Sequence, residues 1–282
     1  MVAHSSIHPP ESPSVVPAIG VFDSGVGGLS VLRHIREQLP GERLLYFADS
    51  LNAPYGPKSQ AFIIERSREI SRFLIGHGAK AIVVACNTAT AAAIQTLRSE
   101  LHIPIIGMEP AVKPAAAATR SGVVGVLATT GTLKSAQFSA LLAHYGKNIR
   151  VVTQACLGLV ECIERGDLDG EATRAVVAEY VAPLIDAGAD TIVLGCTHYP
   201  FVKPLIAEIA GPGVVLIDTG EAVARQVRHR LEGAGVLAVS RTPGTVRAWT
   251  NSPAGNAKQL IRLLHGGDIE VEAIDRQLLN SL

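Results

Sequence analysis

Aromatic side chains and net charge are both scarce in this sequence. Phe, Trp and Tyr make up 4% of the 282 residues, and 25 Lys and Arg balance 25 Asp and Glu, so the formal net charge is zero. A neutral chain lacks the cationic field that attracts general nucleic-acid-binding proteins and proteins of acidic membrane surfaces to their partners. We therefore expect no nucleic acid and no membrane as a partner.

Cysteine and long apolar runs are scarce as well. Four cysteines are too few for a disulfide scaffold in a chain of this length, and no apolar run approaches the ~20 residues that span a bilayer. Residues 1–17 combine Pro, Ser and His without periodicity and lack the features of a signal peptide, which predicts a disordered arm. We expect a soluble, cytoplasmic protein with reduced thiols.

Aliphatic residues, by contrast, are abundant. Hydrophobic residues make up 48% of the chain, which is typical of parallel sheets covered by helices on both faces. Short apolar runs predict buried strands at residues 19–22, 44–47, 81–85, 103–108, 123–127, 151–153, 191–194, 214–217 and 245–249. Helical periodicity lies between them, most clearly over residues 59–76 and 171–187. This alternation predicts a parallel α/β fold.

One segment repeats after 110 residues. Residues 74–86 (LIGHGAKAIVVAC) align without a gap with residues 184–196 (LIDAGADTIVLGC), and both copies end in cysteine. A fainter match relates residues 19–23 to 124–128, although any helix–glycine–strand unit gives a similar match. The repeat predicts two related parallel-sheet α/β domains with the active site in the cleft between them. Their predicted extents are residues 18–112 plus 222–282, and residues 113–221.

Cys86 and Cys196 each end a predicted strand, at the edge where open parallel sheets bind their ligands. Asn87-Thr88 follows the first cysteine and Thr197-His198 the second, and we expect each pair to open a helix. A helix N-terminus favours a bound anion such as a carboxylate. It also lowers the pKa of a nearby thiol from its free value of about 8.5.

Two thiols that approach one ligand from two domains indicate acid/base chemistry at a single carbon. One thiolate can remove a proton from one face while the other thiol returns a proton to the opposite face. A redox pair would prefer Cys-x-x-Cys, which is absent, and a zinc site from Cys86, Cys196 and His198 lacks further spaced ligands. Cys156 and Cys162 are expected to be packing residues.

Two loops follow the first two predicted strands. The first, Asp23-Ser24-Gly25-Val26-Gly27-Gly28, is not a dinucleotide fingerprint, because Ser30 stands where the third glycine should fall. Its Asp23 could assist a thiol or hold an ammonium group, and its Ser24 could donate to a carboxylate. The second, Pro54-Tyr55-Gly56, is either an ordinary Pro-Gly loop or a rigid wall whose Tyr55 hydroxyl or Gly56 amide faces a ligand.

Four motifs together resemble the glutamate racemases of the cofactor-independent aspartate/glutamate racemase superfamily: residues 23–28, 54–56, 85–89 and 195–200. The resemblance runs from about Ile19 to about Ile217. It implies interconversion of L- and D-glutamate, which supplies D-glutamate for peptidoglycan, without a metal or a cofactor. It also implies a homodimer.

The resemblance assigns roles to individual residues. Cys86 and Cys196 would be the acid/base thiols, with Asp23 assisting the first and His198 the second. The substrate-binding residues would be Asp23, Ser24, Tyr55, Gly56, Asn87, Thr88, Thr197 and His198, with Thr132 as a looser match. A third acidic helper falls on Glu164, and Glu161 is the nearby alternative. Leu157 and Glu161 stand where many members of the family carry proline.

The α-proton of an amino acid is too weakly acidic for an ordinary base, and neither a phosphate cradle nor a Schiff-base lysine is evident. We therefore expect a buried cleft that stabilises the carbanion with positioned donors, excludes water and closes by a hinge motion. An aspartate racemase is a near alternative, although such enzymes tend to have an acidic residue in place of His198. A non-catalytic amino-acid-binding module is another, but it leaves both strand-end cysteines unexplained.

Overall fold

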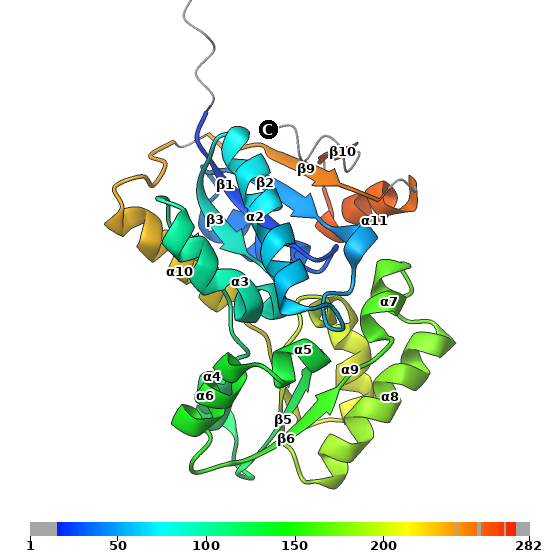
Figure 1. Cartoon of the computed structure of the whole chain (residues 1–282). Coiled ribbons are helices and arrows are strands. Elements are labelled where there is room, and N and C mark those ends of the chain that lie inside the picture. The colour runs from blue at the N-terminus through cyan, green and yellow to red at the C-terminus, as the bar shows by residue number, and fades with distance from the viewer. Residues whose placement is uncertain (1–15, 241, 253–254, 268, 275–282) are drawn as a thin grey trace, which may run out of the picture.

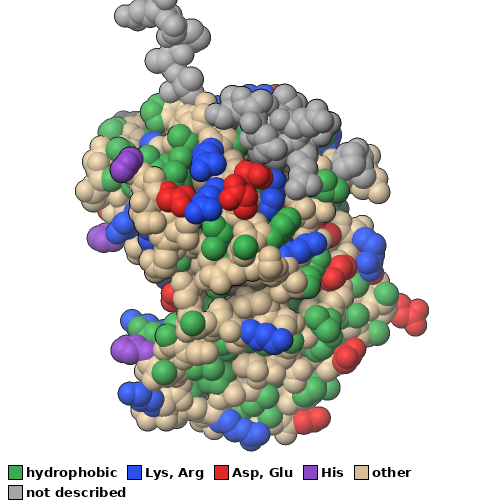
Figure 2. All heavy atoms as spheres, viewed as in Figure 1, with side chains coloured by type: hydrophobic (Ala, Val, Ile, Leu, Met, Phe, Trp, Pro, Cys, Tyr) green, Lys and Arg blue, Asp and Glu red, His purple; other side chains and the backbone are tan. Residues whose placement is uncertain are grey.

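The structure, a computed structural model, describes residues 16–240, 242–252, 255–267 and 269–274. Most of the predicted arm, residues 1–15, lies outside the described residues. Within them, no helix is long and apolar enough to cross a membrane. On the face shown in Figure 2, basic and acidic side chains are interspersed, in keeping with the zero net charge.

The described part of the chain forms two lobes, each built on a parallel sheet (Figure 1). The first lobe has a six-stranded sheet in the order β10-β9-β2-β1-β3-β4. Its strands are β1 (Ala18–Asp23), β2 (Arg43–Ala48), β3 (Ala79–Val84), β4 (Ile105–Ile106), β9 (Val246–Thr250) and β10 (Glu270–Ala273). Its helices are α1 (Leu29–Gln38), η1 (Ser50–Asn52), α2 (Gln60–Gly76), α3 (Asn87–Glu100), α10 (Gly220–Gly233) and α11 (Gly255–His265).

Alternate residues of the buried strand β1 pack into different cores on the two faces of this sheet. Ile19 and Val21 pack in the core that contains the apolar side chains of α1, α10 and α11. Ala18 and Phe22 pack in the core formed with α2 and α3. The helices therefore cover both faces of the sheet, which leaves the carboxyl ends of the strands as the edge for a site.

The second lobe has, in the described chain, a four-stranded sheet in the order β6-β5-β7-β8. Its strands are β5 (Val123–Ala128), β6 (Arg150–Ala155), β7 (Thr191–Leu194) and β8 (Val215–Ile217). Its helices are α4 (Val112–Ala118), α5 (Thr130–Leu133), α6 (Ala136–Tyr145), α7 (Leu159–Glu164), α8 (Glu171–Asp186), η2 (Tyr199–Val202) and α9 (Lys203–Ala210). The predicted fold of two parallel-sheet α/β units is confirmed, whereas the exact domain limits stay predictions.

The internal repeat corresponds to a repeated topology. The order β6-β5-β7-β8 reproduces β2-β1-β3-β4, with each strand of the second sheet in the place of its counterpart in the first. The fainter match of residues 19–23 to 124–128 also has a structural counterpart, because Gly20 and Gly125 have the same role in the two lobes. A Cβ on Gly20 would lie 3.1 Å from Leu74 Cβ of α2, and a Cβ on Gly125 would lie 2.7 Å from Leu184 Cδ1 of α8. In both lobes glycine lets a helix pack close to the central strand.

Two strands differ from their prediction. The run at residues 103–108 forms a strand only at Ile105–Ile106, because Pro104 has no N–H group and the Met108 N–H donates instead to Thr90 Oγ1. Strand β10 was not predicted, since the charged side chains of Glu270 and Glu272 interrupt its apolar pattern. It is the edge strand of its sheet, where charged residues are common.

We predict that Gly20→Ala and Gly125→Ala each lower the free energy of unfolding by about 1–3 kcal/mol, because the added methyl group overpacks the helix–sheet contact. Gly76→Ala is the matched control, since nothing lies within 4 Å of a Cβ at that position. Its stability should stay equal or rise slightly, because alanine favours a helix. Urea unfolding followed by circular dichroism measures all three. If the first two variants are as stable as the wild type, the close contact is not needed.

Candidate active site

The carboxyl ends of both sheets face the junction of the lobes, where a small cavity lies. Both lobes contribute to its wall. Its lining residues are Ser24, Pro54, Tyr55, Gly56, Cys86, Asn87, Thr88, Thr129, Thr132, Val160, Gly195, Cys196, Thr197 and His198. The structure therefore brings most of the predicted site residues to one small cavity.

Cys86 lies on the first-lobe side of the cavity, at the N-cap of α3. Its Sγ accepts a hydrogen bond from the Ala89 N–H at 3.4 Å and lies 3.8 Å from Ser24 Oγ. The helix terminus lowers the pKa of this thiol through the Ala89 N–H, as predicted, but the net shift is upward. Burial raises the pKa of Cys86 well above its usual range, and the nearby charge of Asp23 raises it further, against the smaller effect of the Ala89 N–H.

Cys196 lies on the second-lobe side, two residues after the end of β7 at Leu194, and is 7% exposed. The residues after it turn into the short 3₁₀ helix η2, and the α-helix α9 begins only at Lys203. Thr197-His198 was expected to open a helix, and the helix that follows is this short 3₁₀ helix, with His198 at its N-cap. The Cys196 Sγ lies 3.7 Å from His198 Nδ1.

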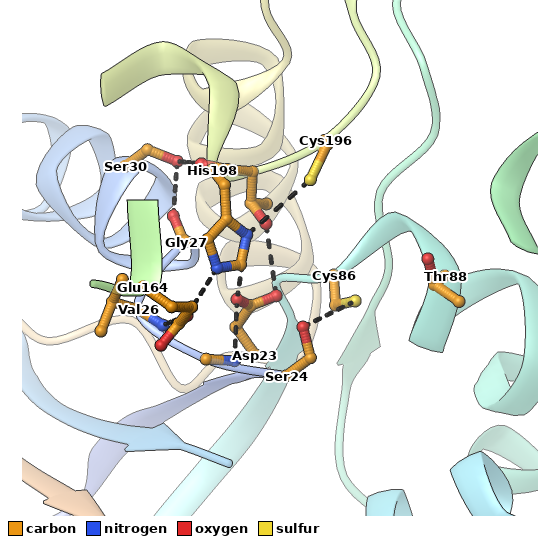
Figure 3. A network of polar contacts seen from close by, with 12 residues as sticks. Asp23, Ser24, Val26, Gly27, Ser30, Cys86, Thr88, Glu164, Cys196 and His198 are labelled. Carbon is orange, nitrogen blue, oxygen red and sulfur yellow. Dashed lines mark hydrogen bonds and ion pairs between the residues drawn. The ribbon is translucent and has the colours of Figure 1, made fainter. Parts of the chain in front are cut away.

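His198 connects this thiol to an acidic residue (Figure 3). Its Nε2 lies 2.7 Å from Glu164 Oε1, and the same oxygen accepts the Val26 N–H at 2.7 Å. Burial lowers the pKa of His198, but the hydrogen bonds with Cys196 and Glu164 outweigh burial and raise the pKa well above its usual range. The arrangement favours an imidazolium ring that can give a proton toward Cys196.

Asp23 is fully buried and lies close to both His198 and Cys86. Its Oδ2 lies 4.0 Å from His198 Nδ1 and accepts the Gly25 N–H, while its Oδ1 accepts the Thr197 hydroxyl at 3.3 Å. Burial raises the pKa of Asp23 to about 6, although the charge of His198 opposes this shift. Asp23 is thus able to hold or release a proton near neutral pH. It was expected to assist Cys86, and in the structure it also contacts the residues that follow Cys196.

The glycine-rich turn admits side chains of the second lobe. A Cβ at Gly25 would lie 1.8 Å from Glu164 Oε1, and a Cβ at Gly27 would lie 2.3 Å from His198 Nδ1. The hydroxyl of Ser30, in the first turn of α1, donates to the Thr197 carbonyl oxygen at 2.9 Å. The glycines therefore allow close approach between the lobes, which explains them without a bound phosphate.

Asn87 and a group of threonines form another side of the cavity. Asn87 is 4% exposed, and neither its amide oxygen nor its amide nitrogen has a hydrogen-bond partner among the described residues. Thr88 Oγ1 lies 2.8 Å from Thr129 Oγ1 and 3.3 Å from Thr132 Oγ1. A buried amide without partners is costly unless a ligand satisfies it.

Thr129 was not among the predicted site residues, although a signal for it exists. The match of residues 19–23 to 124–128 places Thr129 at the position of Ser24 in the other lobe. Both side chains line the same cavity. Continuing the repeat by one residue would have identified Thr129.

The loop after β2 forms a wall of the cavity, but not through the tyrosine hydroxyl. Tyr55 is 1% exposed, and its hydroxyl donates to Asp49 Oδ2 at 2.5 Å. Gly56 lines the cavity close to Thr129, which lies 3.3 Å from where its Cβ would be. The Tyr55 hydroxyl, which was predicted to face a ligand, is therefore bonded to Asp49. Asp49 was not among the predicted site residues.

The structure separates the two candidate acidic helpers, which share helix α7. Glu164 contacts His198, whereas Glu161 is exposed and lines a neighbouring cavity. Cys156 and Cys162 are buried, as packing residues are, and burial raises the pKa of Cys156 to about 12. Among the described residues, no group of three or more His, Cys, Asp or Glu side chains is placed to hold a metal ion.

Residues 19–227 match the model of the Asp/Glu/hydantoin racemase family. The glutamate racemase of Methylococcus capsulatus is 55% identical over 88% of this chain and 92% of its own. Among solved structures, the glutamate racemase of Escherichia coli in complex with L-glutamate matches with a TM-score of 0.82 and 33% identity, over 92% of this chain and 99% of that one. The Francisella tularensis enzyme in complex with D-glutamate matches with a TM-score of 0.79 and 30% identity, over 94% and 99%.

The chain therefore belongs to the Asp/Glu/hydantoin racemase family, amino-acid racemases with two parallel-sheet α/β lobes. Within this family it groups with the glutamate racemases, which it matches at high identity over nearly its whole length.

We predict that Glu164→Gln lowers kcat/KM for glutamate about tenfold or more, because the amide removes the negative charge that favours protonated His198. The pKa of His198 should fall toward its ordinary value, and NMR titration of the ring protons measures this shift. Glu161→Gln is the matched control on the same helix, since its side chain is exposed. Equal activities of the two variants would contradict the role given to Glu164.

We predict that Asp23 makes stability fall as the pH rises. Since its pKa of about 6 in the folded state exceeds the ordinary value of 3.8, the folded state binds more protons than the unfolded chain between about pH 4 and pH 6. The free energy of unfolding of the wild type, relative to that of Asp23→Asn, should decrease by roughly 1 kcal/mol from pH 5 to pH 8. Denaturant unfolding at both pH values tests this prediction. If the unfolding free energies of the two proteins differ by the same amount at pH 5 and pH 8, the pKa of Asp23 is not shifted.

Proposed function

We propose that the chain interconverts L-glutamate and D-glutamate by moving the α-proton between Cys86 and Cys196. The observation that carries this proposal is that the two sulfurs, one from each lobe, line the same cavity. A ligand between them would present opposite faces of one carbon to the two thiols. The family is one of racemases, and the solved relatives include one complex with L-glutamate and one with D-glutamate.

In each turnover one cysteine is a thiolate and the other a thiol. The thiolate takes the α-proton from one face of glutamate, and the thiol donates a proton to the opposite face of the carbanion. The two protons are accounted for by the exchange of roles between Cys86 and Cys196. To restore the starting state, His198 is placed to return a proton to Cys196, and Asp23 is placed to take the proton from Cys86. A proton that passes from Asp23 to His198, which lie 4.0 Å apart, then balances the cycle.

The carbanion needs stabilisation, which fixed donors in a closed site provide. Burial raises the pKa of Cys86, so its thiolate, once formed, is a stronger base than one in water. The Asn87 amide, which has no hydrogen-bond partner within the described part of the chain, can accept from the substrate ammonium group and donate to a carboxylate. The hydroxyls of Ser24, Thr88 and Thr129 line the same cavity. Preorganised donors of this kind supply most of the rate enhancement when no cofactor acts as an electron sink.

The product, D-glutamate, would serve peptidoglycan synthesis in the cytoplasm, and a homodimer would be the working form. These parts of the proposal rest on the resemblance to glutamate racemases. Light scattering on the purified protein measures the oligomeric state directly, and a monomer under turnover conditions would remove the dimer from the proposal.

We predict that the wild type abolishes the optical rotation of L-glutamate in D₂O and incorporates deuterium at the α-carbon, as mass spectrometry detects. Cys86→Ser and Cys196→Ser should each lower racemisation at least about 100-fold, because a serine hydroxyl is a much weaker acid than a thiol. Cys162→Ser, a buried thiol outside the cavity, is the matched control. Full activity of Cys86→Ser or Cys196→Ser would exclude the two-thiol mechanism. Faster racemisation of aspartate than of glutamate would show that aspartate is the substrate.

A further inference from the structure

Below the cavity wall lies a buried carboxylate that the proposed mechanism does not use. Asp49 follows β2 directly and is fully buried. Among the described residues, four side chains donate to it: Tyr55 at 2.5 Å, Arg66 at 2.6 Å, Asn52 at 3.0 Å and Asn251 at 2.5 Å. So many donors fix the position of both carboxylate oxygens and leave no capacity for a ligand. Asp49 is thus a structural anchor for the chain segments to which these four donors belong.

Asn251 is the donor that comes from farthest away in the sequence. It follows β9, the strand next to β2 in the first sheet (Figure 1), and it is 4% exposed. Its amide nitrogen donates to Asp49 Oδ1, and its amide oxygen accepts the Leu51 N–H at 3.0 Å. One side chain therefore holds both the anchor and the backbone of the segment that follows it.

That segment, residues 50–57, leads to the cavity. Pro54, Tyr55 and Gly56 line the cavity, and Tyr55 is tied back to Asp49 through its hydroxyl. Gly56 packs against Thr129 of the second lobe. A shift of the segment would therefore change the cavity wall and its contact with the opposite lobe.

We propose that Asn251 is a positioning residue for substrate binding, which sets the Pro54–Gly56 wall through Asp49 and the Leu51 backbone. The inference rests on the proposed function, because that wall encloses the substrate. It gives the C-terminal segment, which lies beyond the residues 19–227 matched by the family model, a part in the site. The thiols and His198 are held by other elements, so the wall affects binding rather than proton transfer.

The test is to measure KM and kcat separately. Asn251→Ala should raise KM for glutamate about tenfold, as expected for a lost hydrogen bond to a charged group, while kcat stays within about twofold of the wild type. Asn256→Ala is the matched control, since Asn256 is exposed on the neighbouring helix α11 and should change neither constant. An unchanged KM in Asn251→Ala, or a fall in kcat alone, would overturn the proposal.

A double-mutant cycle with Tyr55→Phe distinguishes positioning from general destabilisation. Both side chains act through Asp49, so their effects on KM should be less than additive, whereas independent effects would add. Additivity would overturn the proposal. Calorimetric titration of D-glutamate gives the same comparison as Kd, so Asn251 is tested even if the wild type fails to racemise glutamate, an outcome that would overturn only the proposed function.

Asn251→Asp is a second variant, for use if the alanine variant does not fold. Its carboxyl would keep the acceptor for Leu51 but face the Asp49 carboxylate, with Arg66, Glu69 and the Tyr55 hydroxyl as the other charged or titratable groups of this network. Repulsion between the two carboxylates should displace the wall, so this variant should also raise KM with kcat little changed, and an unchanged KM would overturn the proposal.

Discussion

The pairing of buried charges at the junction of the lobes is the constraint on which this structure depends. Asp23 comes from the first lobe, and His198 and Glu164 come from the second. A buried charge is tolerated only when partners satisfy it, so neither lobe can bury its share alone. The Val26 N–H and the Ser30 hydroxyl add further contacts across the junction. The packing of the lobes against each other and the assembly of the acid/base groups therefore depend on the same contacts.

Much of the fold could be predicted because its determinants are local in the sequence. Buried strands are short aliphatic runs, and the repeat ending at Cys86 and Cys196 revealed both the duplication and the two thiols. Strand β10 escaped prediction because an edge strand carries charged residues such as Glu272. The strand at Ile105–Ile106 was predicted too long because Pro104 interrupts the ladder.

The parts of the site that could not be predicted depend on tertiary contacts. Asn251 and Asp49 are 202 residues apart in sequence, and nothing in either neighbourhood indicates the other. The net shift of the Cys86 pKa could not be predicted for a related reason. A helix N-terminus is visible in the sequence, whereas desolvation depends on how completely the opposite lobe covers the thiol, and here desolvation is the larger effect.

The duplicated sheets place the two thiols equivalently but surround them differently. Cys86 has a backbone N–H at the start of α3, and Cys196 has an imidazole. Yet L- and D-glutamate have equal free energies in water, because mirror images cannot differ in an achiral solvent. For the interconversion of the two enantiomers, kcat/KM must therefore be the same in both directions. The different surroundings of the two thiols can therefore make kcat and KM differ between the two directions, but only in the same proportion.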